Sequence, residues 1–319
     1  MSYKVLIPQM IAQEGIDDLK RSGYEVKMGS GTSQEDLIHD VADCDAILLR
    51  TAVITREVLE AGRNLKIVAR HGAGYNNVDI KAAEELGIWV TNAPDSTTNS
   101  VAEFTLGAII AAAKRTFLLR DSLKRDDFYF KNTNKGLDLK GKTLGIIGLG
   151  RIGSQVAKKA CYGLDMKILA YDPFAKKENL PEYVTLVGWE EIFAQSDFIS
   201  LHLPLIDSTR GCIGEKEFAA MKSSAYFINC ARGEVVDQKA LTAALKENRI
   251  AGAFLDVLDK EPFSASEELV SMDNVVVTPH MASNTEECMM LMATQAASQI
   301  HRVLSGEQPD WPVNHPMGK

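Results

Sequence analysis

Apolar and polar positions alternate along the chain with two periods. Short continuous apolar runs predict buried strands, and stretches with apolar residues three and four positions apart predict amphipathic helices. In the first part of the chain, the predicted strands are 5–8, 24–28, 46–49, 66–70 and 88–91, and the predicted helices are 11–22, 33–41, 55–61 and 79–86. Strands that alternate with helices are typical of a parallel sheet with right-handed crossovers. Residues 1–99 are therefore predicted to form a small doubly wound α/β domain.

A long apolar stretch follows at 100–120. Because it is apolar on nearly all sides, it predicts one long helix that is buried on most faces. Ser100 and Glu103 fit a capping box at its start. The stretch is compatible both with a helix at a domain or subunit interface and with a plain core helix.

The alternation of strands and helices resumes after the polar stretch 124–139. The predicted strands are 144–147, 167–171, 198–203, 225–229, 253–257 and 275–278, and the predicted helices are 151–160, 189–194, 215–220 and 238–247. This pattern predicts a second doubly wound domain with six strands. A last long helix at 284–305 is predicted to return to the first domain.

Three glycines separate the first strand of the second domain from its helix. Gly148, Gly150 and Gly153 have the spacing G-x-G-x-x-G. The first allows a tight turn, the second lets a pyrophosphate approach the backbone, and the third lets the helix pack closely on the strand. The next strand is closed by Asp172, whose carboxylate can accept hydrogen bonds from ribose hydroxyls and would repel a 2′-phosphate. The segment predicts a Rossmann domain that binds NAD rather than NADP.

Composition narrows the class of protein further. The chain has 319 residues, of which 45% are hydrophobic and 24% charged, as in ordinary globular proteins with two domains. A net charge of −8 argues against a nucleic-acid partner. No apolar run is long enough to span a membrane, and the N-terminus has no signal-peptide pattern. The five cysteines are scattered and form no metal-ligand motif, so a cytoplasmic, metal-free protein is expected.

Candidate catalytic side chains follow predicted strands, at the edge of the sheet where open α/β sheets bind ligands. Arg232 follows the strand 225–229, and a guanidinium can hold a carboxylate in a bidentate fork. His280 follows the strand 275–278, and histidine is a common general base because its pKa lies near neutrality. A carboxylate could orient this histidine, and the sequence leaves Asp259 and Glu261 as alternatives.

The first domain offers a second group of candidates at its strand ends. The loop 70–79 contains small residues, whose exposed backbone N–H groups could form an anion-binding nest. Arg50 ends another predicted strand of the same domain. Both features indicate a site for an anionic ligand.

Together these segments resemble the D-isomer-specific 2-hydroxyacid dehydrogenases. The resemblance covers nearly the whole chain and rests on the glycine motif with Asp172, the stretch 196–205 with Thr209, and the stretch 221–237. It implies a Rossmann cofactor domain at 100–284, inserted in a flavodoxin-like substrate-binding domain at 1–99 and 285–319, with a cleft between the domains that closes on substrate. It also implies a homodimer joined through the cofactor domain.

The resemblance assigns roles residue by residue. It implies hydride transfer between NAD and a small 2-hydroxy or 2-oxo acid, with Arg232, Glu261 and His280 as catalytic residues, and so favours Glu261 over Asp259. The implied substrate-binding residues are Arg50, Ala73, Gly74, Arg232 and His280. The implied cofactor-binding residues are Ala73, Thr98, Gly148, Gly150, Arg151, Ile152, Gly153, Asp172, Leu203, Pro204, Thr209, Cys230, Ala231, Asp256 and Ser283.

The identity of the acid is less constrained. Arg50, Arg70 and Lys131 resemble positions where phosphoglycerate dehydrogenases of the family place cations for a phosphate, which favours 3-phosphoglycerate. Reductases of hydroxypyruvate or glyoxylate are the alternative within the family. An NADH-sensing, corepressor-like binding protein is an alternative from another class, which the acidic charge disfavours. Because the chain ends at Lys319, the serine-binding module of longer relatives, and feedback control through it, are not expected.

Overall fold

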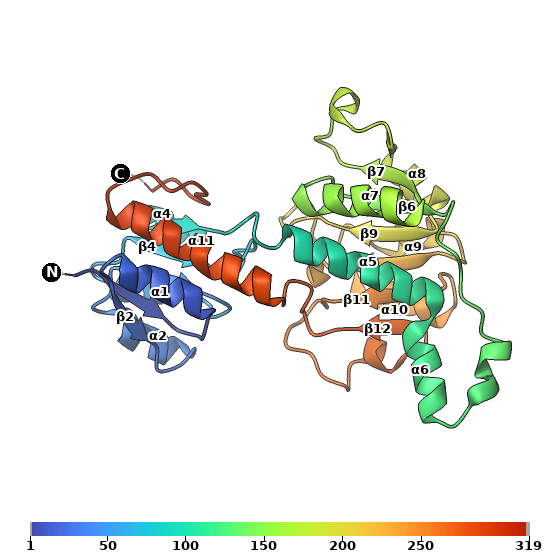
Figure 1. Cartoon of the computed structure of the whole chain (residues 1–319), viewed down its shortest axis with the longest axis horizontal. Helices are drawn as coiled ribbons and strands as arrows, with labels where there is room; N and C mark the ends of the chain where they lie inside the picture. The colour runs from blue at the N-terminus through green and yellow to red at the C-terminus, as the bar shows by residue number, and fades with distance from the viewer. Residues whose placement is uncertain (1, 317–319) are drawn as a thin grey trace. The chain divides into compact units, whose positions relative to one another are not determined.

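The computed structural model describes residues 2–316, and the chain divides into two compact units (Figure 1). The first unit comprises residues 1–97 and 284–319, and the second comprises residues 98–283. Each unit contains one parallel sheet with helices on both faces, so the predicted fold class is confirmed. That the first unit binds substrate remains a proposal.

The first unit is built on a five-stranded parallel sheet in the order β2-β1-β3-β4-β5. Every strand predicted for it is present, with ends within one residue of the prediction. The strands are β1 (Lys4–Ile7), β2 (Glu25–Met28), β3 (Ala46–Leu49), β4 (Ile67–Arg70) and β5 (Trp89–Thr91). The helices are α1 (Gln13–Arg21), α2 (Gln34–Val41), α3 (Arg56–Ala61), α4 (Ile80–Glu85) and α11 (Glu286–Leu304).

The last helix, α11, packs on α1 of the first unit, as predicted from its place in the sequence. The two helices approach closely at Gly15, where an added Cβ would lie 2.7 Å from the Cβ of Ala293. Glycine is therefore required at this crossing because any side chain would push the helices apart. The tail after α11 is fixed by Asn314, whose side chain accepts from Val90 N at 2.8 Å and donates to Ile88 O at 2.9 Å.

The second unit is built on a seven-stranded parallel sheet in the order β12-β11-β10-β9-β6-β7-β8. The strands are β6 (Thr143–Ile147), β7 (Lys167–Tyr171), β8 (Val184–Leu186), β9 (Phe198–Leu201), β10 (Tyr226–Asn229), β11 (Gly252–Leu255) and β12 (Val275–Val277). The prediction of six strands was wrong, because it missed the edge strand β8. This strand has only three residues, and its central Thr185 is exposed, so it lacks the continuous apolar run of a buried strand.

Helices of the second unit cover both faces of this sheet, and α6 projects away from it (Figure 1). The α-helices are α5 (Thr98–Lys114), α6 (Thr116–Lys124), α7 (Arg151–Leu164), α8 (Trp189–Gln195), α9 (Glu215–Ala220) and α10 (Gln238–Lys246). The 3-10 helices are η1 (Phe128–Asn132), η2 (Lys177–Asn179), η3 (Gly233–Val235) and η4 (Glu268–Ser271).

The single long helix predicted at 100–120 is instead two helices. Arg115 interrupts it with a φ of 53°, between α5 and α6. The predicted burial of α5 on most faces is confirmed, since only one side, with Glu103, Gly107 and Ile110, is exposed. The predicted capping box, however, is wrong, since the helix already begins at Thr98 and the Glu103 carboxylate accepts from Asn99 Nδ2 at 2.9 Å.

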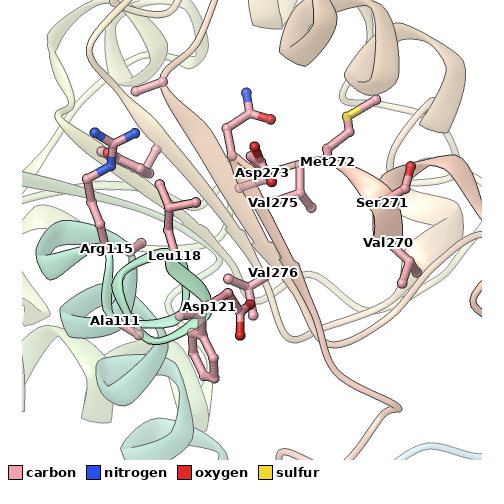
Figure 2. Close-up of a pocket in the computed structure, with 16 residues that line it drawn as sticks. Ala111, Arg115, Leu118, Asp121, Val270, Ser271, Met272, Asp273, Val275 and Val276 are labelled. Carbon is pink, nitrogen blue, oxygen red and sulfur yellow. The ribbon is translucent and has the colours of Figure 1, made fainter. Parts of the chain in front are cut away.

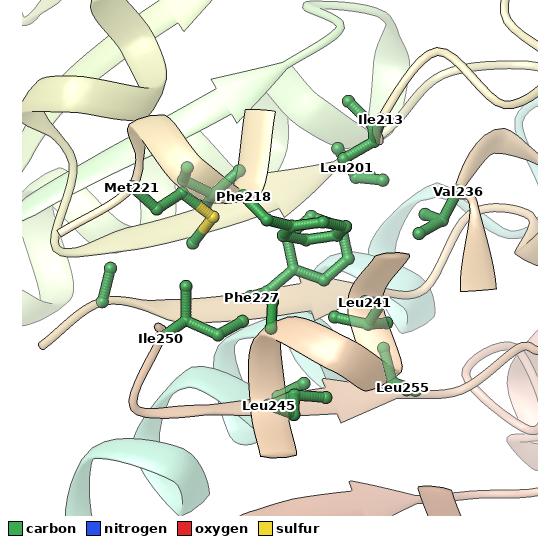
Figure 3. Close-up of a cluster of buried hydrophobic side chains, with 14 of the residues drawn as sticks. Leu201, Ile213, Phe218, Met221, Phe227, Val236, Leu241, Leu245, Ile250 and Leu255 are labelled. Carbon is green, nitrogen blue, oxygen red and sulfur yellow. The ribbon is translucent and has the colours of Figure 1, made fainter. Parts of the chain in front are cut away.

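One apolar cluster fixes the position of the strands that carry the candidate site. It packs α9 and α10 against β9, β10 and β11 (Figure 3). The rings of Phe218 and Phe227 meet edge to face at its centre, with centroids 5.2 Å apart. Because both rings are fully buried, the strands are fixed relative to each other and so are the loops at their carboxyl ends.

Within the described part of the chain, no helix has the length and apolar character needed to cross a bilayer.

Replacing Asn314 with leucine tests how the C-terminal tail is attached. The change leaves the Val90 N–H and the Ile88 carbonyl buried without partners, so we expect the free energy of unfolding to fall by about 3 kcal/mol. The exposed Gln308 of the same tail is the matched control, and Gln308→Ala is expected to change stability by less than about 0.5 kcal/mol. Urea denaturation measures both. Equal stabilities for Asn314→Leu and the native chain would contradict this description of the tail.

Candidate active site

Three neighbouring strands of the second unit end at the candidate catalytic residues. The strands β10, β11 and β12 are parallel neighbours, and Arg232, Glu261 and His280 lie in the segments that follow their carboxyl ends. His280 Nδ1 and Glu261 Oε2 are 2.8 Å apart, within hydrogen-bond distance. The contact selects Glu261 rather than Asp259 as the partner of the imidazole. With Nδ1 engaged, Nε2 is the nitrogen that can exchange a proton with a ligand.

The backbone of His280 adopts a left-handed conformation, with a φ of 50°. Its N–H donates to the carbonyl of Asp256 at 2.8 Å. The Asp256 carboxylate, which is fully buried, accepts from Thr278 Oγ1 at 2.6 Å, Met281 N at 2.9 Å and Ala282 N at 2.8 Å. Asp256 therefore closes the turn 278–282 and sets the direction of the imidazole.

Burial raises the pKa of the Asp256 carboxyl, while the hydrogen bonds from Thr278, Met281 and Ala282 oppose this rise because they stabilise the charged form. With three donors aimed at its two oxygens, the carboxylate can remain charged without exposure to water. The same residue therefore links the end of β11 to the end of β12.

The segment that contains Arg232 is held in place by Asn229, the last residue of β10. The side chain of Asn229, which is 1% exposed, donates from Nδ2 to Arg232 O at 2.9 Å and accepts from Ala231 N at 2.9 Å. The guanidinium donates from Nη1 to Ala231 O at 2.6 Å. Burial lowers the pKa of Arg232, and the negative charges of Glu261 and Glu234 oppose this effect. Arginine stays protonated under these conditions, so the site holds a partly desolvated cation.

A close backbone contact joins the loops of Arg232 and Glu261. A Cβ added to Gly233 would lie 1.8 Å from the carbonyl oxygen of Leu258, so this position accepts only glycine. Sequence reasoning had not assigned a role to Gly233, Asn229 or Thr278. For Asn229 and Thr278 the available signal was a polar residue at the end of a buried strand, whereas Gly233 lies in the loop after β10 and had no such signal.

The glycine turn has the geometry that the dinucleotide prediction requires. Gly148 has a φ of 97°, and a Cβ added to Gly153 would lie 2.0 Å from the Gly148 oxygen. By contrast, a Cβ added to Gly150 would meet no atom within 4 Å, so the space beside this glycine is open. Gly150 is also the N-cap of α7, whose first residues are Arg151 and Ile152. Their N–H groups lie at a helix N-terminus, where phosphates bind favourably.

Asp172 lies beside this turn. Its carboxylate accepts from Leu149 N at 2.8 Å and from Phe174 N at 2.8 Å. These bonds fix the carboxylate next to the first turn of α7, where it can also accept from a ribose. They also place a negative charge where a 2′-phosphate would need a cation.

The remaining cofactor candidates of the second unit lie in segments that follow the carboxyl ends of other strands of the same sheet. Thr209 Oγ1 donates to Pro204 O at 2.6 Å and accepts from Ile206 N at 3.0 Å, which closes the loop after β9. Leu203 is the second residue of that loop, and its side chain lies 3.4 Å from a Cβ built on Gly148. Cys230 and Ala231 follow β10, and Ser283 is the last residue of the unit. Burial raises the pKa of the Cys230 thiol to about 12, so this thiol is not a nucleophile at neutral pH.

One buried polar atom fits a bound dinucleotide. The hydroxyl of Thr98 is buried and has no partner among the described residues. A buried hydroxyl without a hydrogen bond is costly, and a ligand group would satisfy it. The open space at Gly150 and the Thr98 hydroxyl are therefore both consistent with NAD. Among the described residues, no cluster of histidine, cysteine and carboxylate side chains could hold a metal ion.

The substrate candidates of the first unit lie at the carboxyl ends of β3 and β4. Arg50 Nη1 donates to Met10 O at 3.4 Å, and Arg70 Nε donates to Asn77 Oδ1 at 2.9 Å. No hydrogen bond within residues 2–316 uses the N–H of Ala73 or Gly74, so both can bind an anion. Lys131 belongs to the second unit, where its Nζ lies 3.8 Å from the centroid of the Phe128 ring.

Two glycines of α7, one in the glycine turn and one outside it, give a matched test of whether the dinucleotide binds at this turn. In Gly153→Ala the new Cβ collides with the Gly148 carbonyl, so we expect NADH affinity to fall about tenfold or more. In Gly163→Ala the new Cβ meets open space, so we expect unchanged NADH affinity and a gain in stability of about 0.5–1 kcal/mol. Fluorescence titration with NADH measures both affinities. Native affinity in Gly153→Ala would show that the dinucleotide does not use this turn.

Comparison with known proteins agrees with this geometry. Residues 106–282 match the family model described as D-isomer specific 2-hydroxyacid dehydrogenase, NAD binding domain. The D-3-phosphoglycerate dehydrogenase of Methanocaldococcus jannaschii is 42% identical over 316 residues, which cover 98% of this chain and 60% of that protein. The glyoxylate reductase of Korarchaeum cryptofilum is 38% identical over 330 residues, which cover 100% of this chain and 98% of that protein.

A solved structure of a Thermus thermophilus protein superimposes with a TM-score of 0.88 at 33% identity, and covers 97% of this chain and 99% of that one. The chain spans between 56% and 60% of the length of three curated phosphoglycerate dehydrogenases that it matches. The model match covers more than half of the chain and falls on the unit that contains the glycine turn and the His280–Glu261 pair. The chain therefore belongs to the D-isomer-specific 2-hydroxyacid dehydrogenase family, whose NAD-binding domain is its second unit.

Proposed function

We propose that the protein is an NAD-dependent D-2-hydroxyacid dehydrogenase, which in reverse reduces 2-oxo acids. The observation that carries this proposal is the pairing of His280 Nδ1 with Glu261 Oε2 at 2.8 Å, in the segments after β12 and β11. The half-buried Arg232 follows the neighbouring strand β10. A base, its carboxylate partner and a carboxylate-binding cation are the groups that oxidation of a 2-hydroxy acid requires.

The proposed mechanism uses His280 Nε2, the ring nitrogen that does not contact Glu261. His280 Nε2 takes the hydroxyl proton of the substrate while the C2–H bond breaks and the C2–O bond becomes a carbonyl. A dinucleotide held at the glycine turn would supply the hydride acceptor as NAD and, in the reverse direction, the hydride donor as NADH. Arg232 holds the substrate carboxylate and stabilises the partial negative charge on the reacting oxygen. Glu261 fixes the imidazole tautomer and stabilises the protonated imidazole after the transfer.

We propose that Arg50, Ala73 and Gly74 of the first unit also bind the substrate. The unused N–H groups of Ala73 and Gly74 suit the substrate carboxylate. Arg50 and Arg70 lie at neighbouring strand ends and suit a second anionic group, as does Lys131. These cations favour 3-phosphoglycerate, in agreement with the name of the Methanocaldococcus relative. Reduction of glyoxylate or hydroxypyruvate is the second candidate, and the name of the Korarchaeum relative supports it.

Steady-state oxidation of NADH with a panel of 2-oxo acids tests the activity and the substrate together. The panel contains 3-phosphohydroxypyruvate, hydroxypyruvate, glyoxylate and pyruvate. We expect the highest kcat/KM for the phosphorylated acid. A higher kcat/KM for glyoxylate would instead support the second candidate, and absence of turnover with every acid would contradict the enzymatic role.

The variant His280→Asn is the matched control for this assay. Asparagine tolerates the positive φ of position 280 but cannot act as a base near neutral pH. We therefore expect kcat to fall by roughly 10²–10⁴-fold, while NADH binds as in the native protein. Native turnover in this variant would eliminate His280 as the proton acceptor.

We propose that the protein is a homodimer joined through the second unit. The segment formed by α6 and η1 presents three large apolar side chains to solvent: Leu123 is 61% exposed, Phe128 58% and Tyr129 74%. Apolar side chains gathered on one projecting segment are typical of an interface. Sedimentation equilibrium should give twice the chain mass, and Tyr129→Asp should shift the protein towards the monomer. A monomeric native protein would contradict this proposal.

We also propose a cytoplasmic location. Within residues 2–316 no disulfide joins the five cysteines, as expected of a protein in a reducing compartment. Cell fractionation of the source organism would check this location, and recovery outside the cytoplasm would contradict it.

A further inference from the structure

A cavity of about 170 Å³ lies in the second unit between α6 and β12 (Figure 2). Arg115 and Leu118 line it on the helical side, and Asp273 and Val275 line it on the side of β12. Because α6 belongs to the segment that we propose as the subunit interface, we expect a second copy to cover this cavity. The first unit, by contrast, has a hydrogen-bond network at its strand ends that bears on the choice of substrate.

The loop 70–79 is joined to the segment after β3 by the side chain of Asn77. Its Nδ2 donates to Ala52 O at 2.7 Å, and its Oδ1 accepts from Arg70 Nε at 2.9 Å. Because a guanidinium only donates and a carbonyl only accepts, the amide fits in this one orientation. The Asn77 carbonyl also accepts from Ile54 N at 2.8 Å. One half-buried residue therefore contacts both the backbone after β3 and the cation at the end of β4.

The backbone that Asn77 contacts after β3 is itself held in place by Gln9. Gln9 Oε1 accepts from Thr51 N at 2.8 Å and from Ala52 N at 2.9 Å, and Gln9 Nε2 donates to Thr51 Oγ1 at 2.8 Å. The N–H and the carbonyl of the buried Ala52 are thus both engaged. Asn77 is therefore anchored to a backbone that hydrogen bonds hold on both sides.

Two uncharged acceptors fix the plane of the Arg70 guanidinium. Besides the bond from Nε to Asn77, its Nη1 donates to His71 O at 2.6 Å. Gly72 leaves room for this arrangement, since it has a φ of 139° and a Cβ there would lie 3.3 Å from Arg70 Nη1. Neutral acceptors orient a guanidinium without neutralising it. An arginine oriented in this way loses less conformational entropy when it binds an anion.

A second asparagine holds the other side of the same loop. Asn92, which follows β5, donates from Nδ2 to Ala73 O at 2.7 Å. This bond directs the Ala73 carbonyl towards β5 and so supports the stretch 73–74, whose N–H groups suit a carboxylate. Asn92 and Asn77 thus support two different parts of the proposed substrate site.

We propose that Asn77 is a positioning residue that sets the preference for a second anionic group on the substrate. It acts through Arg70, whose guanidinium it orients, and not on the carboxylate that every 2-hydroxy acid carries. This role rests on the proposed function, in which Arg70 suits the second anionic group. The preference then depends on a neutral amide at position 77 and is separable from carboxylate binding.

Ligand binding to the NADH complex of the full chain tests this role without turnover, because NADH cannot accept a hydride. The ligands are D-3-phosphoglycerate and D-glycerate, which differ only in the phosphate, and isothermal titration calorimetry measures both dissociation constants. In the native chain we expect the phosphorylated acid to bind about tenfold more tightly or better. In Asn77→Ala we expect this ratio to fall about three- to tenfold, while the affinity for D-glycerate is retained. Retained D-glycerate binding also shows that the loop is folded.

Asn77→Asp is a second change, with nearly the native shape. Its carboxylate can still accept from Arg70 Nε, but it neutralises the guanidinium. We therefore expect the preference for the phosphorylated acid to fall in this variant too, with native affinity for D-glycerate. This variant tests the role even if Asn77→Ala is too unstable to isolate.

Two further variants separate specificity from general support of the fold. Gln34→Ala removes the contacts of Gln34 with Val53 O at 2.9 Å and Thr55 Oγ1 at 2.8 Å, on the same segment after β3, and should leave both affinities unchanged. Asn92→Ala should weaken the binding of both acids about equally, by roughly threefold or more, so that their ratio stays native.

A native ratio in both Asn77 variants would overturn the proposed role, and so would equal affinity of the native chain for the two acids. An equal loss of the ratio in Gln34→Ala would also overturn it, because Asn77 would then act only as a general support of the fold. Turnover of 2-oxo acids with NADH judges the activity separately. Turnover combined with a ratio that ignores Asn77 refutes only the role of Asn77, whereas absence of turnover refutes the enzymatic role.

Discussion

The position of His280 depends on one buried carboxylate. Asp256 accepts hydrogen bonds from Thr278, Met281 and Ala282, and its carbonyl accepts from the N–H of His280. These bonds hold a histidine at a φ of 50°, a conformation that is unfavourable for this residue without such support. The cost of burying the charge is offset by three donors, so a single side chain both ends β11 and shapes the turn after β12.

The parallel sheet brings the residues of the candidate site together. Because β10, β11 and β12 are parallel neighbours, the residues after all three strands gather at one edge. Gly233 lets the loop after β10 touch the loop after β11, and the Glu261–His280 hydrogen bond joins the loop after β11 to the turn after β12. The guanidinium, the carboxylate and the imidazole therefore lie in segments that follow strands of one sheet, which is the kind of support that a catalytic group needs.

Much of this arrangement could be predicted from the sequence, and the failures have physical causes. Buried parallel strands have continuous apolar runs, so their ends, and with them Arg232 and His280, could be located. The edge strand β8 lacks such a run and was missed. The break at Arg115 has no signal in the apolar pattern, because its side chain is held by Asn134, which is distant in sequence. Asp259 and Glu261 share one acidic loop, and only the tertiary contact at 2.8 Å, or a family resemblance, distinguishes them.

The central claim is that Glu261 acts only through His280, and a double-mutant cycle tests it most directly. The quantities to measure are kcat/KM for Glu261→Gln, for His280→Asn and for the double variant. Residues that act as one unit give non-additive losses. The account predicts that Glu261→Gln alone lowers kcat/KM about tenfold or more, and that the double variant is no slower than His280→Asn alone, within a factor of about three. Losses that multiply in the double variant would show that the two residues act independently, and would contradict the account.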